Sequence, residues 1–201
     1  MRRAVFLALV LSAAPLRAQD APAPWPALHE VAGVAANDVL NLRAAPDAGA
    51  AIVGALAPDA TGVEVVAVTD GWGLVNTGEG TGYAKMAYLV PEPGGGWADL
   101  NRPMACFGTE PFWSLAYEPG NPALRLATPE GPAQELFISN VWVSRPWATP
   151  AALGLEGGML VLRPAECSDG MSDHTYGLAV DLFLTGATAA RYSGCCSLQI
   201  R

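Results

Sequence analysis

The four cysteines constrain the fold of this chain more than any other feature. They are Cys106, Cys167, Cys195 and Cys196, so all of them lie in the second half of the 201 residues. An even number of cysteines in an exported chain indicates disulfides. A bond between the neighbours Cys195 and Cys196 would close a small, strained ring. We therefore expect two bridges, in which each neighbour pairs with Cys106 or Cys167, and the sequence leaves both connectivities open.

Export is predicted by the first eighteen residues, "MRRAVFLALVLSAAPLRA". Arg2 and Arg3 precede an apolar run, and the small residue Ala18 ends the segment, which is typical of a secretory signal peptide cleaved before Gln19. The run is too short to span a bilayer, and no later stretch reaches the roughly 20 apolar residues that a transmembrane helix needs. We expect a periplasmic or secreted protein with no transmembrane segment.

The charge of the mature chain argues against nucleic acid and membrane partners. Removing the signal peptide takes away three of the 11 basic residues, which leaves 8 against 19 acidic ones and a net charge of about −11. Such a surface repels phosphate backbones and anionic lipids. Lys85 is the only lysine, so we expect no basic recognition patch.

Proline and glycine mark the boundary between two expected domains. The stretch "VPEPGGGWADLNRP" combines prolines with three consecutive glycines, which disfavour regular structure. The sequence predicts five parts: a signal peptide at 1–18, a proline-rich tether at 19–27, a first domain at 28–91, a linker at 92–102 and a cysteine-bearing domain at 103–201.

Short apolar segments separated by turn residues fill the first domain. The segment "IVGAL" is followed by the β-branched run "GVEVVAV", and the turn pair Asp70 and Gly71 then leads into "WGLV". Five or so short strands with glycine-rich turns in about 60 residues predict a small β-barrel.

The first domain resembles a bacterial SH3-like (SH3b) domain. The resemblance runs in order across residues 28–91 and is carried by "LNLRAAPD", "IVGALAPDATGVEVV", "DGWGLV" and "GTGYAKMAYL". It implies an SH3-like barrel that binds cell-wall material or an envelope protein. Trp72 and Tyr83 are the candidate ligand contacts, because aromatic rings offer sugars and peptides a flat apolar platform. The alternative is that both rings fill the core, and Arg43 is expected to be a solvated or salt-bridged side chain.

The second domain also contains short segments that alternate with a period of two, such as "ALRLAT" and "YGLAVDLFL". No long apolar run has helical spacing. We expect a six-stranded, mostly antiparallel barrel or sandwich with loops at "EPGNP" and "RPWATPAALGLEGG". The fold class predicted for the whole chain is therefore all-β.

Three motifs in the second domain resemble a domain of bacterial envelope proteins and lipoproteins that has no established activity. They are "CFGTEPFW" from Cys106, "CSDGMSD" from Cys167 and "SGCC" from Ser193. The resemblance implies a location in the cell envelope and gives no mechanism.

The stretch "CSDGMSDHTYG" suggests either a turn or a metal site. Cys167, Asp169, Asp173 and His174 offer mixed ligands, but a disulfide-bonded cysteine is no thiolate and the chain has only two histidines. We expect a turn in which Asp169 bonds nearby backbone amides, no metal site, and a His174 that is not an essential ligand. A functional alternative is that the loop presents Asp169, Met171 and Asp173 to a partner.

No arrangement in the sequence specifies a reaction. Ser172 or Ser193 would need His174 and Asp181 as partners in a hydrolase, and nothing resembles a nucleophile elbow. A glycosidase pair of Glu110 with Asp169 is a weaker hypothesis. We therefore assign no catalytic residue and no cofactor, and expect an envelope-associated binding protein. The alternatives are an enzyme acting on envelope components and a structural envelope component.

Overall fold

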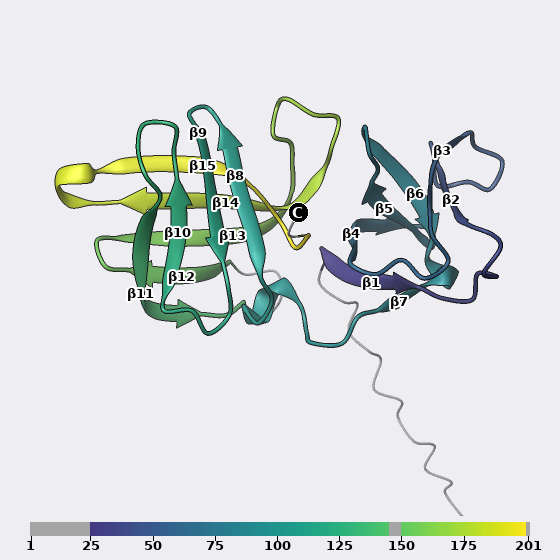
Figure 1. Cartoon of the computed structure of the whole chain (residues 1–201), viewed down its shortest axis with the longest axis horizontal. Coiled ribbons are helices and arrows are strands. Elements are labelled where there is room, and N and C mark those ends of the chain that lie inside the picture. The colour runs from purple at the N-terminus through teal and green to yellow at the C-terminus, as the bar shows by residue number, and fades with distance from the viewer. Residues whose placement is uncertain (1–24, 145–149, 200–201) are drawn as a thin grey trace, which may run out of the picture.

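The computed structural model describes residues 25–144 and 150–199, which form two β units lying end to end (Figure 1). The expected signal peptide and most of the expected tether lie outside the described residues. Within the described ranges, no helix is long and apolar enough to cross a membrane. Strands dominate both units, which confirms the all-β prediction.

The N-terminal unit is one antiparallel sheet with the strand order β3-β2-β6-β5-β4-β1-β7. Its elements are β1 (Ala27–Val31), β2 (Leu40–Arg43), β3 (Ile52–Leu56), β4 (Val63–Thr69), β5 (Trp72–Asn76), β6 (Thr81–Lys85), the 3-10 helix η1 (Met86–Tyr88) and β7 (Leu89–Pro91). The sheet wraps around a small core that includes Val31, Leu42 and Val65. The segments expected to be strands are strands, and β1 is an additional one.

The C-terminal unit is a closed antiparallel barrel with the order β10-β11-β12-β13-β14-β15-β8-β9. Its strands are β8 (Met104–Thr109), β9 (Phe112–Tyr117), β10 (Ala123–Ala127), β11 (Gln134–Trp142), β12 (Ala151–Leu155), β13 (Gly158–Cys167), β14 (Tyr176–Leu184) and β15 (Ala190–Ser197), and the 3-10 helix η3 (Gly186–Thr188) precedes the last. The barrel alternative is thus confirmed, but six strands were too few. The missed strands are β8 and β12, and β12 lies inside the stretch expected to be a loop.

Leucine side chains fill the barrel, among them Leu124, Leu153 and Leu178, each with essentially no exposed surface. Two disulfides cross-link the strands around this core. One joins Cys106 on β8 to Cys196 on β15, and the other joins Cys167 at the end of β13 to Cys195. The structure therefore confirms two bridges and selects one of the two connectivities left open by the sequence.

Part of the expected linker packs into the barrel. The 3-10 helix η2 (Trp97–Asp99) places Trp97 in the barrel core, where it has no exposed surface, and Leu100 follows it there. The indole N–H of Trp97 also donates to the backbone oxygen of Trp25, 3.2 Å away. Arg102 closes the glycine turn by donating to the backbone oxygen of Gly95 at 2.9 Å. This segment therefore contacts both units and is not a flexible linker without contacts of its own.

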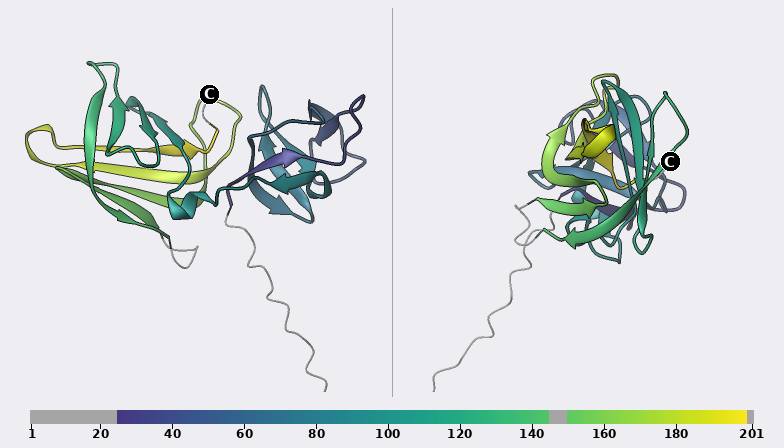
Figure 2. Two further views of the ribbon diagram at one scale, coloured as in Figure 1. Left: turned by 60° about the horizontal axis from the view of Figure 1, so that its bottom comes forward. Right: turned by 90° about the vertical axis from the view of Figure 1, so that its left-hand side faces the viewer.

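The N-terminal sheet faces the end of the barrel that carries the β13–β14 loop and the last described residues (Figure 2). Asn76 donates to the backbone oxygen of Thr175 and accepts from its N–H, both at 3.0 Å. The side chain of Gln199 donates to the backbone oxygen of Gly62 at 2.6 Å. The two units therefore meet through specific polar contacts.

Candidate functional site

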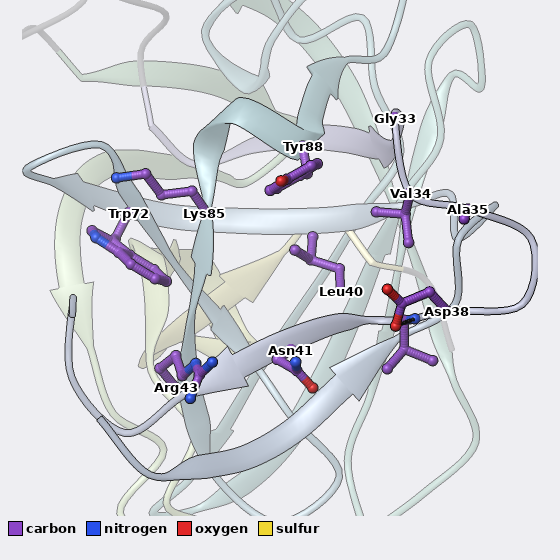
Figure 3. Close-up of a pocket in the computed structure, with 11 residues that line it drawn as sticks. Gly33, Val34, Ala35, Asp38, Leu40, Asn41, Arg43, Trp72, Lys85 and Tyr88 are labelled. Atoms are coloured by element: carbon purple, nitrogen blue, oxygen red, sulfur yellow. Dashed lines mark hydrogen bonds between the residues drawn. The ribbon is translucent and has the colours of Figure 1, made fainter. Parts of the chain in front are cut away.

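A groove opens in the N-terminal unit where β2 leaves its neighbour β6. These strands pair only at Arg43 and Tyr83, and the rest of β2 pairs with β3 on its other side. The gap between β2 and the η1 segment forms a groove of about 440 Å³ (Figure 3). Its lining includes Asp38, Asn41, Arg43, Trp72, Lys85 and Tyr88.

A tight hairpin positions the aromatic end of this groove. Asp70 and Gly71 both have positive φ, 51° and 75°, as the two-residue turn between β4 and β5 requires. Trp72 follows the turn directly and pairs with Lys85 across the β5–β6 ladder. The Lys85 ammonium lies 4.8 Å from the centre of the Trp72 ring, which is a cation–π contact. Trp72 as a whole residue is only 9% exposed, so it lines the groove and also packs against the sheet.

Tyr88 gives the groove an exposed aromatic edge. The hydrogen bond from the N–H of Met86 to the backbone oxygen of Gly71, at 3.0 Å, ties the start of η1 to the β4–β5 turn. Tyr88 ends η1 and is 42% exposed. In Figure 3 the Tyr88 ring lies above Leu40 and Asn41, so it faces the β2 side of the groove from across the gap.

The charges of the groove are separated along its length. Figure 3 shows Arg43 and Lys85 near Trp72 at one end, and Asp38 at the other. One guanidinium nitrogen of Arg43 donates to the backbone oxygen of Ala50 at 2.9 Å, which fixes that side chain. Asp38 accepts a hydrogen bond from the N–H of Val39 at 2.8 Å. A ligand with an anionic end and a cationic end matches this arrangement.

The two aromatic residues singled out from the sequence have different positions. Trp72 lines the groove and is also buried against the sheet, so it has features of both predicted roles, a core residue and a ligand contact. Tyr83 does not line it: this side chain is half-buried on β6, between the partners Leu74 and Arg43 in the ladders. The sequence analysis did not predict that Tyr88 lines the groove. It also did not predict that the two cationic side chains Arg43 and Lys85 line the same groove. Their only sequence signal is that Arg43 alternates with inward-facing leucines.

The stretch "CSDGMSDHTYG" forms the β13–β14 connection, and its first part is a hydrogen-bonded turn. Asp169 accepts from the N–H groups of Met171 and Ser172 at 3.0 and 2.9 Å, and from the Ser172 hydroxyl at 2.8 Å. Partial burial alone would raise the pKa of Asp169, but these hydrogen bonds lower it below its usual value. The turn interpretation therefore describes the contacts of Asp169 correctly.

The later residues of this loop face the N-terminal unit. His174 Nε2 lies 3.1 Å from the backbone oxygen of Thr77, and the side chain of Asp173 lies beside Gly80. Asp169 and Met171 instead line a second hollow at the end of the barrel. The three candidate contacts of the loop are thus divided between two locations.

The residues considered for a hydrolase are not brought together, whereas Glu110 and Asp169, considered as a glycosidase pair, line the same second hollow. Ser193 donates to Asp181 at 2.7 Å, but His174 contacts Thr77 in the other unit. Asp181 is held by Arg163 and Arg191 at 2.6 and 3.1 Å. Over residues 25–144 and 150–199, no group of three His, Cys, Asp or Glu side chains is arranged to hold a metal ion.

The curved antiparallel sheet and its aromatic groove form one small unit. Residues 38–90 match the family model of the bacterial SH3 domain, so this part of the chain is a bacterial SH3 domain. The match confirms the resemblance of the first domain to a bacterial SH3-like domain. Neither a curated protein nor a solved structure matches the chain.

Proposed function

We propose that this chain is an extracytoplasmic binding protein whose SH3 domain holds a peptide of the bacterial cell wall in the groove between β2 and η1. One observation carries the proposal: an aromatic groove with separated charges lies within a domain of a family that often binds cell-wall material. The two disulfides are compatible with a location outside the cytoplasm.

The chemistry of the groove favours a short peptide with free carboxylates. Arg43 and Lys85 lie at one end of the groove in a chain whose formal net charge is −8, so they form a local cationic site on an acidic protein. Carboxylates of a cell-wall peptide would bind there by charge-assisted hydrogen bonds. Trp72 and Tyr88 would contact its aliphatic parts, and Asp38 would accept its amino group.

The proposal is tested by cosedimentation of the purified protein with isolated cell-wall sacculi. Tyr88→Ala removes an exposed ring, and Lys85→Gln removes the charge beside Trp72. We expect the first to weaken binding about fivefold to tenfold and the second about threefold to fivefold.

Two matched variants serve as controls. Trp142→Ala removes an exposed aromatic ring from the barrel, and Arg125→Gln removes an exposed positive charge from β10. Both should bind sacculi like the unchanged protein. Equal losses in the groove variants and in the controls would contradict the proposal, as would full binding by the groove variants.

A further inference from the structure

Three segments that are far apart in the sequence meet around a hollow at one end of the barrel. The β8–β9 turn contributes Glu110 and Phe112, the β13–β14 loop contributes Asp169 and Met171, and β15 contributes Ser193. The hollow measures about 530 Å³. It shares no lining residue with the SH3 groove. These segments carry the three motifs that the sequence analysis singled out.

Packing explains the glycines and the tryptophan of these motifs. A Cβ on Gly108 would lie 2.3 Å from Nε1 of Trp113, and a Cβ on Gly194 would lie 2.0 Å from the backbone oxygen of Phe107. Both distances are too short, so the close approach of these strands requires glycine. Trp113 is buried and donates to the backbone oxygen of Ser193 at 3.3 Å.

The wall formed by the β13–β14 loop is held in place before any ligand binds. The Thr109 hydroxyl donates to the backbone oxygen of Asp169 at 2.8 Å, which ties the loop to β8. The Cys167–Cys195 disulfide ties the start of the loop to β15. A wall fixed in this way loses little conformational entropy on binding.

Three side chains of the same segments are left without a role in packing. Phe112 is 54% exposed and Met171 is 69% exposed, although both are large and apolar. Glu110 is exposed and forms no ion pair with any described residue. All three line the hollow. Exposed apolar side chains gathered at one concave site indicate an interaction surface.

The composition of the lining selects a cationic ligand. Two acidic residues, Glu110 and Asp169, line the hollow, and no basic residue does. The Phe112 ring and the Met171 thioether suit an alkyl chain, and a phenyl face also attracts an ammonium group. We propose that this hollow is a second binding site, for a peptide that carries a lysine-like amino side chain. An acidic peptide would be repelled by the same carboxylates.

The site is tested by NMR titration of the full chain with three blocked tripeptides, Ala-Lys-Ala, Ala-norleucine-Ala and Ala-Glu-Ala. The readout is the methyl signal of Met171, assigned with Met171→Leu. We expect the lysine peptide to shift this signal with saturation, the norleucine peptide to bind about fivefold more weakly, and the glutamate peptide to leave it unchanged.

Variants separate the site from general surface effects. Glu110→Gln and Phe112→Ala should each weaken binding of the lysine peptide about threefold to fivefold. The controls Glu118→Gln and Phe183→Ala alter an exposed acid and an exposed ring elsewhere on the barrel and should change nothing. The proposal is wrong if no peptide shifts the Met171 signal, if all three shift it equally, or if Glu110→Gln has no effect. None of these outcomes bears on the SH3 groove.

Discussion

The carboxylate of Glu64, on β4 of the SH3 domain, accepts a hydrogen bond of 2.5 Å from the hydroxyl of Ser197, the last residue of β15. Its other oxygen accepts the N–H of Leu198 at 3.1 Å. Glu64 is only 3% exposed, although it lies between the two β units. Burial raises its pKa above the usual value, and the hydrogen bonds only partly offset that effect. One buried carboxylate therefore links the N-terminal sheet to the end of the barrel.

This carboxylate predicts a pH dependence of stability. Because the pKa of Glu64 is raised in the folded protein, its contribution is complete below the unfolded value of about 4.5 and is lost as the pH rises through the folded value. Glu64→Gln keeps an oxygen acceptor for Ser197 without the charge. We expect the variant to gain stability relative to the unchanged protein as the pH rises above 4.5, measured by urea unfolding across the pH range.

The matched control is Glu79→Gln, because Glu79 is an exposed acid in the β5–β6 loop of the same unit. Its effect on the free energy of unfolding should be small and nearly independent of pH. A constant difference between Glu64→Gln and the unchanged protein at every pH would refute the assignment.

The two hydrogen bonds between Asn76 and the backbone of Thr175 are expected to hold the β13–β14 loop against the N-terminal sheet. Asn76→Ala removes two hydrogen bonds of 3.0 Å and leaves the backbone groups of Thr175 without these partners. We expect a loss of about 1–3 kcal/mol of stability and faster hydrogen exchange in the loop. Asn37→Ala, at an exposed position, is the control. Unchanged exchange in the Asn76 variant would show that the contact does not hold the loop.

The two disulfides should contribute unequally. The Cys106–Cys196 bridge spans 90 residues and the Cys167–Cys195 bridge spans 28. Loop-closure entropy predicts about 4–5 kcal/mol for the longer loop and about 3–4 kcal/mol for the shorter one. The measurement is the free energy of unfolding after each pair is replaced by alanine. A larger loss from removing the shorter bridge would contradict the entropic account.

Asp181 predicts an effect at the acidic end of the pH range. Its partial burial alone would raise its pKa, but hydrogen bonds from Ser193, Arg191 and Arg163 lower it below 3.8. The stability from this group is therefore present above the unfolded value and lost as the pH falls through the folded one. Asp181→Asn should cost about 1 kcal/mol at neutral pH, and the cost should shrink in acid. A cost that stays constant down to acidic pH would exclude this role.

Local patterns in the sequence were sufficient for most strands of the N-terminal sheet, although they missed β1. The alternation of Leu40 and Leu42 with polar residues predicts the orientation of β2 correctly, and the β-branched run predicts β4. The segment "AALGL" has no such signal, because it contains no β-branched or aromatic residue, and alanine and glycine are depleted in strands. It is a strand since β11 and β13 pair with both of its edges, and closure of the barrel supplies those partners.

Two features, the disulfide connectivity and the groove, depend on contacts that no local sequence pattern encodes. Cys195 and Cys196 are neighbours on one strand, so their side chains point to opposite faces, and the partner on each face is fixed by the barrel. The groove exists because β2 pairs with β6 only at its last residue, Arg43, so the earlier part of β2 lies apart from β6, and Lys85 and Tyr88 lie across the groove from it. Both are properties of tertiary structure.

The central claim is that the SH3 groove binds peptide carboxylates. The most direct measurement is an NMR titration of the full chain with Ala-Glu-Ala bearing free carboxylates, read at the indole N–H of Trp72, which Trp72→Phe assigns. We predict a saturable shift, about tenfold weaker with the fully amidated Ala-Gln-Ala peptide and about threefold to fivefold weaker in Lys85→Gln. An unshifted Trp72 signal, or equal binding of the acidic and amidated peptides, would contradict the claim.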